Sequence, residues 1–394
     1  REGSPYVIER PSYVFNATLT IEPGTLVCGE PGATLSFNGA RLLANGTAAE
    51  PIVFSATDTT AGWGGLTWWN TGADTSYIRH ALIEHAGTTA ETPAALFTTG
   101  LESAVAVEDT RIRQSRNSAV YFLAAGSRLN RVVVDTVRGS TFAAVVLGDS
   151  TTFENSTVRG SDAAGIGLTG WTPTTIRLLG GVVENSAGVG VLEQADENYP
   201  TVIEAAPLRV TGSGSVPFQG TVSSFARIWP NAAAQANLTG NARNVVVFAG
   251  PGNVADVTAT ATAVIPWEVE ANQTFMQGAV LRAEPGARIA MGSAASLWFT
   301  VHDAYGGPAG RLDAAGTANA PVVFTALGDS LADRWAGLHF LGVPADTSRL
   351  RHVRIGHATE GVIAGSVDPS NNIPGNRPVT LDSVQLPRIA GRAG

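Results

Sequence analysis

Asn117-Ser118-Ala-Val-Tyr-Phe-Leu123 decides the fold, because similar stretches follow it at a short and regular spacing. They are Gly139-Ser140-Thr-Phe-Ala-Ala-Val-Val-Leu147, Gly160-Ser161-Asp-Ala-Ala-Gly-Ile-Gly-Leu168 and Asn185-Ser186-Ala-Gly-Val-Gly-Val-Leu192. The four serines are 22, 21 and 25 residues apart (140−118, 161−140 and 186−161). A period in the low twenties with several short β-branched runs predicts an all-β, right-handed parallel β-helix solenoid of about three strands per coil. We expect Ser118, Ser140, Ser161 and Ser186 to stack in one column.

A β-sandwich is the rival fold, and its hairpins would leave turn signals and an alternation of apolar and polar residues. Asn-Gly occurs only at Asn38-Gly39 and Asn45-Gly46, and the run Ala143–Leu147 is apolar throughout. A continuous apolar run is typical of a strand buried in a parallel sheet. The β-helix is therefore favoured.

The sequence also contains a longer repeat, in addition to the short one. Leu19–Gly24 returns as Leu281–Gly286, Gly46–Phe54 as Gly316–Phe324, Trp63–Leu66 as Trp335–Leu338, and Arg79-His80 with His85-Ala86 as Arg351-His352 with His357-Ala358. The offsets grow from 262 (284−22) to 272 (335−63), so we expect the extra residues between Met291 and Asp313. The repeat predicts two tandem units, a first over 1–262 and a shorter second over 263–394, joined at Val257–Pro266.

The opening of each copy resembles a known group of proteins. Ala17-Thr-Leu-Thr-Ile-Glu-Pro-Gly24, then Asn45–Phe54 and Trp63-Gly-Gly-Leu66, is similar to the opening coil of bacterial secreted right-handed β-helix repeat proteins. Pro5-Tyr-Val-Ile8 and Pro266-Trp-Glu-Val269 match the segment that precedes that coil. Many such proteins lie at the surface or in the periplasm and have no assigned role. The resemblance implies a β-helix along nearly the whole chain and a periplasmic or extracellular location.

Composition excludes several classes of function. The 394 residues include 45 glycines and 15% charged residues, which suits short strands and tight turns. All 25 basic residues are arginine, so lysine Schiff-base chemistry is excluded. A formal charge of −8 argues against a nucleic-acid partner.

No apolar stretch is long enough for a transmembrane helix, and Cys28 alone forms no intrachain disulfide. Arg1-Glu-Gly-Ser is not a secretory signal, so we expect a processed chain or one made without a signal.

Three arginines precede the aligned serine motifs. Arg116, Arg138 and Arg159 should therefore stack as a column, with Glu184 at the fourth position. Like charges on neighbouring coils repel, so the column needs partners, and the local candidates are Asp135, Glu154, Asp162 and Glu184. One interpretation is a salt-bridged solvated face. The other is a groove for an anionic glycan or an acidic protein, bound by the guanidinium fork.

Histidine and tryptophan supply the remaining candidates. His80, His85, His352 and His357 stand at duplicated positions, which a coil template explains without metal chemistry. No complete metal-ligand set is visible, so we expect no metal site. Trp68 and Trp69 are adjacent on a strand and point to opposite faces, so one of them should be exposed and could contact a partner.

These observations lead to a hypothesis about function. We expect a non-catalytic, exported β-helix scaffold or binding protein, an extrinsic structural subunit of a larger assembly, with Arg116, Arg138, Arg159, Trp68 and Trp69 as binding residues and no cofactor. The partner would be a protein, for example at the periplasmic face of a membrane complex such as a photosynthetic reaction centre, or an anionic glycan.

The alternative is a carbohydrate-active enzyme, or a polysaccharide-binding or adhesion protein, of the β-helix type. A pectinolytic enzyme would show clustered acidic residues on one sheet. Asp109, Asp135, Glu154 and Glu184 differ in register relative to the serines, so we expect no catalytic residues.

Overall fold

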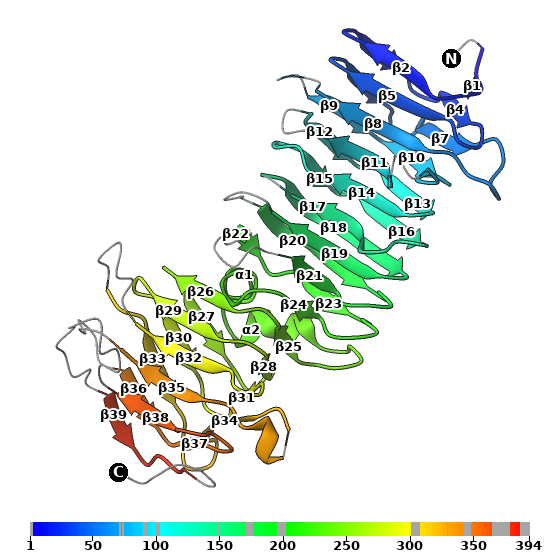
Figure 1. Cartoon of the computed structure of the whole chain (residues 1–394). Coiled ribbons are helices and arrows are strands. Elements are labelled where there is room, and N and C mark those ends of the chain that lie inside the picture. The colour runs from blue at the N-terminus through cyan, green and yellow to red at the C-terminus, as the bar shows by residue number, and fades with distance from the viewer. Residues whose placement is uncertain are drawn as a thin grey trace. The chain divides into compact units, whose positions relative to one another are not determined.

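The chain folds as a parallel β-solenoid in the computed structural model (Figure 1). The structure describes residues 3–70, 72, 75–89, 93–99, 103–148, 150–170, 176–194, 202–300, 308–328, 330–341, 348–364 and 379–386. The strands pair in parallel, each with the equivalent strand of a neighbouring coil, as β10 (Ala81–Glu84) pairs with β7 (Ile52–Ala56) and β13 (Arg111–Ser115). The predicted parallel β-helix is therefore confirmed. No helix in the described ranges has the length and apolar character to cross a membrane.

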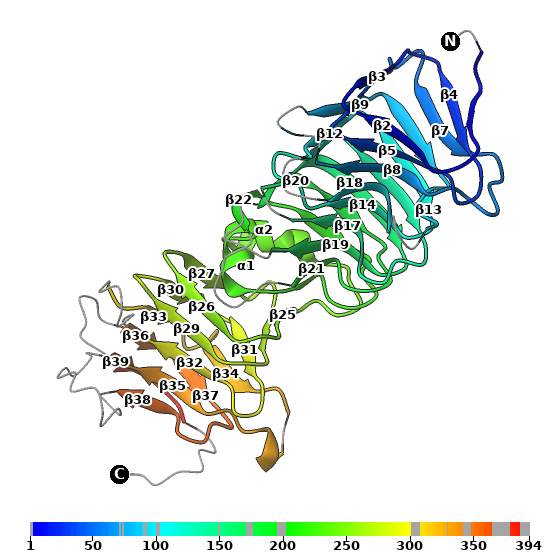
Figure 2. The same ribbon diagram turned by 45° about the horizontal axis from the view of Figure 1, so that its top comes forward.

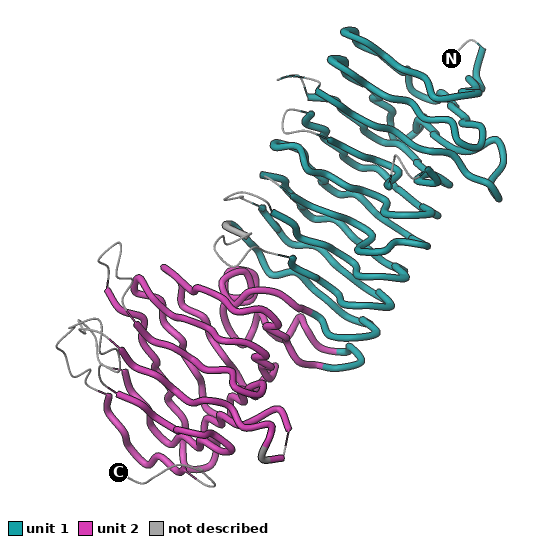
Figure 3. Tube along the Cα trace, in the orientation of Figure 1, with its two compact units in different colours: residues 1–217, 240–243 teal, residues 218–239, 244–394 magenta. Residues whose placement is uncertain are grey.

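Contacts within the chain divide it into two compact units (Figure 3). Unit 1 comprises residues 1–217 and 240–243, and unit 2 comprises residues 218–239 and 244–394. These are units of packing. The division at residue 262, inferred from duplicated sequence, stays a prediction.

Unit 1 has three faces. Face 1 contains β1 (Tyr6–Ile8), β4 (Leu26–Gly29), β7, β10, β13, β16 (Val133–Val137), the second half of β18 (Thr152–Ser161), the second half of β20 (Ile176–Glu184) and β23 (Arg209–Thr211). Face 2 contains β2 (Ser12–Phe15), β5 (Thr34–Asn38), β8 (Gly65–Trp69), β11 (Ala94–Thr99), β14 (Ser118–Phe122), β17 (Ala143–Leu147), β19 (Ala164–Thr169) and β21 (Val191–Gln194). Face 3 contains β3 (Thr18–Ile21), β6 (Arg41–Asn45), β9 (Ser76–Arg79), β12 (Val105–Glu108), β15 (Arg128–Asn130), the first halves of β18 and β20, and β22 (Val202–Ala206).

Alternate residues of each strand point into the solenoid and form its core. On face 2, Leu66, Leu96 and Val120 occupy one such position on successive coils, and all three are fully buried. Figure 2 shows β8, β14, β17 and β19 stacked along this face. Burial of a column of this kind is the main stabilising contribution, at about 25 cal/mol per Å² of apolar surface. The apolar run Ala143–Leu147, predicted to be buried, is buried at every residue.

Unit 2 repeats the three-faced plan. One face contains β24 (Phe218–Gln219), β25 (Val246–Phe248), β28 (Trp267–Val269), β31 (Arg288–Met291), β34 (Val322–Ala326) and β37 (Val353–Ile355). The second contains β26 (Gly252–Ala255), β29 (Gln273–Met276), β32 (Ser296–Phe299), β35 (Gly337–Phe340) and β38 (Val362–Ala364). The third contains β27 (Thr258–Ala261), β30 (Val280–Ala283), β33 (Arg311–Ala315), β36 (Ser348–Arg351) and β39 (Val379–Asp382). The predicted join at 257–266 thus includes an ordered strand, β27.

A short helical segment, which the sequence analysis did not predict, interrupts the strands of unit 2. Helices α1 (Val222–Ile228) and α2 (Ala232–Gln235) are followed by η1 (Ala236–Leu238), and a second 3₁₀ turn, η2, covers Leu331–Asp333. Thr221 caps α1 by accepting a hydrogen bond from the Ser224 N–H, and Asn231 caps α2 by accepting one from the Ala234 N–H. These caps and the spacing of Val222, Phe225 and Ile228 favour a helix at this point, locally overriding the strand pattern.

The two sequence copies build equivalent coils. Trp63 bridges to Ala86 and Trp335 to Ala358, and both indoles are fully buried. The indole N–H of Trp63 donates to the Glu84 carbonyl, and that of Trp335 donates to the Gly356 carbonyl. The residues that shift the offset from 262 to 270 lie between the end of β32 and the start of β33, inside the predicted interval, whereas the two that raise it to 272 lie between β34 and Trp335, outside that interval. Residues 301–307 of that connection lie outside the described ranges.

Candidate functional site

The arginines in the middle coils of unit 1 separate into two groups by their partners. Nine arginines lie between residues 75 and 194. Seven of them form ion pairs with carboxylates: Arg79, Arg111, Arg113, Arg128, Arg131, Arg159 and Arg177. The other two, Arg116 and Arg138, form no ion pair with a described residue. Neither guanidinium forms an ion pair with a described carboxylate, and the two line one hollow, so these two residues define the candidate site.

Face 1 carries a ladder of alternating charge. Strand register places Glu84, Arg113, Asp135, Arg159 and Glu184 side by side on successive coils. Arg113 contacts Glu84 at 2.7 Å and Arg159 contacts Asp135 at 3.2 Å, while Arg111 also pairs with Asp135. Burial raises the pKa of Asp135, but the hydrogen bonds from Arg111 and Arg159 outweigh it and leave the pKa below its usual value.

This ladder corrects two predictions. Arg159 does not share a column with Arg116 and Arg138, because its neighbours in register are Asp135 and Glu184. Asp135 and Glu184, predicted to differ in register, do share a column, with Arg159 between them. Asp135 was among the predicted partners of the arginines, and that part is confirmed.

The predicted serine column is also wrong in part, because the strand register differs from the one that the sequence motif suggested. Ser161 and Ser186 are equivalent, since each lies two residues beyond the paired Arg159 and Glu184. Ser118 instead begins β14, in the register of Ala143. The turn between β16 and β17 has five residues, whereas the turn between β18 and β19 has two. Alignment on the shared Arg-Gly-Ser motif therefore shifts the strands. Ser118 and Ser140 still meet, with their Oγ atoms 3.5 Å apart.

Arg116 and Arg138 lie together in a groove along the corner between faces 1 and 2. A first hollow of about 490 Å³ is lined by Thr59, His85, Gln114, Ser115, Arg116, Thr136, Arg138 and Gly139. The Arg116 guanidinium donates to the carbonyl groups of Thr59 (3.3 Å) and Thr60, which hold it against the β7–β8 connection. Arg138 is exposed. Two of the three predicted arginines therefore share one site.

A second hollow adjoins the first. Its volume is about 520 Å³, and it shares Thr136 and Arg138 with the first hollow. Its further lining includes Gly160, Asp162, Asn185, Ala187 and Gly212. The Asp162 carboxylate accepts a hydrogen bond from the Gly139 N–H, which fixes the turn beside Arg138. The two hollows form one continuous groove over successive coils.

The groove follows a column of left-handed backbone positions. The φ angles are +56° at His85, +54° at Gln114, +57° at Thr136 and +56° at Asn185, and the column also includes Gly160 and Gly212. The left-handed conformation turns each coil sharply from face 1 to face 2 and tolerates few bulky residues. Small or polar side chains therefore line this corner, which keeps it open to solvent.

The same geometry explains the duplicated histidines. His80 and His352 have φ angles of +46° and +47°, and His85 and His357 both have +56°. Histidine, like asparagine and aspartate, is enriched in the left-handed region, so the coil template accounts for its recurrence. The described residues contain no group of three or more His, Cys, Asp or Glu side chains suited to a metal ion.

The tryptophan pair divides as alternation on a strand predicts. Trp68 is fully buried, stacks on Phe37 with ring centroids 5.4 Å apart, and donates its indole N–H to Ser76 Oγ at 2.9 Å. Trp69 is 41% exposed. Only Trp69 can therefore contact a partner, and it lies at the end of β8 remote from the corner that holds Arg116 and Arg138. The structure does not join the aromatic and arginine candidates into one site.

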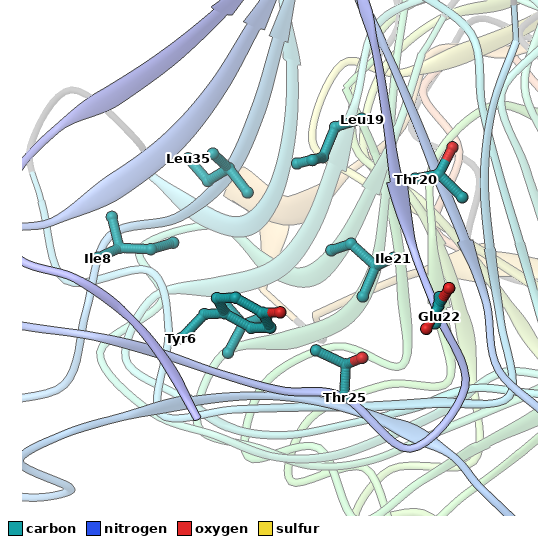
Figure 4. Close-up of a pocket in the computed structure, with 9 residues that line it drawn as sticks. Tyr6, Ile8, Leu19, Thr20, Ile21, Glu22, Thr25 and Leu35 are labelled. Carbon is teal, nitrogen blue, oxygen red and sulfur yellow. The ribbon is translucent and has the colours of Figure 1, made fainter. Parts of the chain in front are cut away.

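A separate pocket, distinct from the two hollows of the groove, lies at the first coil of unit 1. Figure 4 shows Ile8, Leu19, Ile21 and Leu35 around a largely apolar pocket of about 610 Å³. Ile8 lies on β1 and Leu19 and Ile21 lie on β3, which are the terminal strands of faces 1 and 3, and Tyr6 on β1 is 46% exposed. The lining resembles an uncovered core and offers few polar groups to orient a ligand.

Sequence reasoning missed one buried histidine in unit 2. His339 stacks on Trp298 with ring centroids 4.1 Å apart, and Glu360 lies 3.9 Å from its Nε2 atom. Burial lowers the pKa of His339, and the nearby Glu360 opposes that shift. His339 has no counterpart among the duplicated histidines, since Thr67 occupies the equivalent position in the first copy. No signal in the repeat pointed to it.

Comparison with known proteins shows little similarity. No protein-family model matches the chain, and no curated protein matches it. Among solved structures, the chain is similar to an alginate lyase from Paenibacillus sp. str. FPU-7 at 11% identity and a TM-score of 0.17. The match covers 86% of this chain and 99% of the lyase chain. Agreement this low supports no inference about activity.

Proposed function

We propose that this chain is a non-catalytic β-helix binding protein and that the corner groove of unit 1 holds an anionic partner. One observation carries the proposal. Between residues 75 and 194, every arginine outside the groove has a carboxylate partner, whereas Arg116 and Arg138 pair with no described carboxylate and line the same hollow. Guanidinium groups bind carboxylates in a planar fork, so two of them in one groove favour an acidic partner.

The arrangement of titratable groups supports binding over catalysis. General acid–base catalysis needs two such groups converging on one reacting bond. Of the carboxylates with a lowered pKa, Asp109 and Asp135 lie outside the groove in ion pairs with Arg131 and with Arg111 and Arg159, and Asp333 belongs to unit 2. In the groove, His85 lines the first hollow and Asp162 lines the second, so these two titratable groups do not share one hollow.

The test compares two double variants with the same change in charge. Full-length wild type, R116A/R138A and the control R111A/R128A are titrated calorimetrically at low ionic strength with polygalacturonate and with poly-L-glutamate. We expect wild type to bind at least one polyanion and R116A/R138A to lose about tenfold or more in affinity, since charge-assisted hydrogen bonds are lost. The control should change by less than about twofold, because exposed paired charges contribute little.

Two results would contradict the proposal. If neither polyanion binds, or if both double variants lose affinity equally, the groove is not the binding site. If wild type releases reducing ends or unsaturated sugars from polygalacturonate and R116A/R138A does not, the chain is a carbohydrate-active enzyme.

A further inference from the structure

We infer that the anionic partner is an acidic polysaccharide, extended along the groove from the arginine pair towards Asn185 and Gly212. This inference rests on the proposed function and names the class of ligand. Three properties of the groove carry it: the chemistry of its lining, its length, and the distribution of charge along it.

The lining favours a ligand rich in hydroxyl groups. Thr59, Gln114, Thr136 and Asn185 present hydroxyl and amide groups that both donate and accept hydrogen bonds. The apolar residues of the second hollow are Val137 and Ala187, and neither hollow is lined by Phe, Tyr, Trp or another large apolar side chain. Protein interfaces usually concentrate their binding energy in such large anchors. An acidic protein surface would find the two arginines here but no apolar anchor.

The length of the groove favours a polymer. Its left-handed corner residues come from six successive coils, at His85, Gln114, Thr136, Gly160, Asn185 and Gly212. Coils stack at the spacing of neighbouring strands, so six coils span roughly 24 Å. A small anion would occupy only the arginine end. An extended chain would use the polar groups along the whole corner.

The charge distribution favours a polymer that carries hydroxyl groups between its acidic groups. Arg116 lines the first hollow, Arg138 lines both hollows, and Asp162 places a carboxylate in the second hollow. A carboxylate repels any ligand carboxylate placed beside it but accepts hydrogen bonds from sugar hydroxyls, and the side chains of an acidic peptide offer it no hydroxyl group. A uronate polymer satisfies both requirements.

Two comparisons test this inference. Affinities of the full chain are measured for hexagalacturonate and for hexaglutamate with an acetylated N-terminus and an amidated C-terminus, which match in number of acidic groups. We expect hexagalacturonate to bind about tenfold more tightly, the factor that one or two additional hydrogen bonds provide. Equal affinity, or tighter binding of hexaglutamate, would overturn the polysaccharide assignment and leave the proposed function standing. Binding of neither ligand would overturn both.

The second comparison tests the extended course of the ligand. Ala187 is exposed in the second hollow, and its replacement there changes charge without removing a buried contact. Ala187→Glu should weaken hexagalacturonate binding about threefold or more, as expected for a like charge placed near the ligand, and leave digalacturonate binding unchanged. Ala187→Ser is the neutral control. An unchanged affinity of Ala187→Glu for hexagalacturonate would contradict an extended course along the groove.

Discussion

The two copies of the coil template share their internal hydrogen bonds but differ in what covers their first coil. Ser76 Oγ accepts a hydrogen bond from the Leu42 N–H, and Ser348 Oγ accepts the equivalent bond from the Leu312 N–H. In the first copy Tyr6 is 46% exposed, whereas its equivalent in the second copy, Trp267, is 1% exposed. The same position of the template is therefore half exposed in the first copy and buried in the second.

The covering of the second copy comes from a further coil and from the helical segment. Strands β25, β26 and β27 pair with β28, β29 and β30. The rings of Phe248 and Phe225 lie 5.0 and 5.6 Å from the Trp267 ring. Each coil of a solenoid buries its apolar side only against its neighbours, so the edge residues of one copy become core residues in the other.

The comparison also separates architecture from binding. What the copies share is the set of inward side chains, the corner residues and the buried tryptophans, all of which build coils. Arg116 and Arg138 lie in coils that follow the first copy, where the template motifs have ended. A repeat identifies the residues that specify the fold, and departures from the repeat are where a binding site is to be sought.

The largest expected effect tests whether the copies are equivalent. Trp63→Ala and Trp335→Ala each remove a fully buried indole and its hydrogen bond to a carbonyl group. We expect each to lower the free energy of unfolding by about 3–5 kcal/mol, measured by denaturant titration. A cost below about 1 kcal/mol at only one site would show that the two positions are not equivalent.

The next effect tests the difference in covering. Trp267→Ala should lower the free energy of unfolding by about 3–5 kcal/mol, because it leaves a cavity among aromatic rings. Tyr6→Ala should cost about 1 kcal/mol, since nearly half of its side chain already faces solvent. Similar costs at the two sites would contradict the account of an uncovered first coil.

A smaller effect distinguishes the two equivalent serines. Ser76 Oγ accepts from both the Leu42 N–H and the Trp68 indole N–H, whereas the described bond of Ser348 Oγ is that from the Leu312 N–H. Ser76→Ala should therefore cost about 2–3 kcal/mol and Ser348→Ala about 1–2 kcal/mol, because buried donors lose their acceptor. The reverse order in denaturant titrations would be incompatible with these contacts.

The smallest effect on stability concerns the charge ladder, whose first member, Glu84, is replaced by Gly356 at the equivalent position of the second copy. Asp135→Asn should cost about 1 kcal/mol at pH 7, because both arginine partners are about half exposed. The folded pKa of Asp135 is lowered, so its contribution is complete above the unfolded value of about 3.9 and is lost as the pH falls through the folded value. The difference between wild type and variant should then vanish in acid, as followed by thermal unfolding. A difference independent of pH would exclude the ionic origin.

Sequence reasoning succeeded where the position and facing of a residue follow from the period of the repeat. The short repeat predicted parallel coils, and alternation on β8 predicted that one member of the pair Trp68 and Trp69 would be exposed. It failed where the length of a turn determines the register of the neighbouring strands. The motif Arg-Gly-Ser looks alike at residues 138 and 159, but the turns that follow differ by three residues and place the arginines in different columns. Ion-pair partners come from neighbouring coils, so an error of register hides which arginine is neutralised.

The most direct test of the central claim compares the two arginines that the sequence grouped and the structure separates. Arg138 lines the groove without a described carboxylate partner, and Arg159 is neutralised by Asp135. Each of R138A and R159A removes one positive charge, and their affinities for polygalacturonate are measured by calorimetry at one ionic strength. We expect R138A to bind about tenfold more weakly than wild type and R159A to stay within about twofold. Equal losses in the two variants, or a greater loss in R159A, would contradict the account.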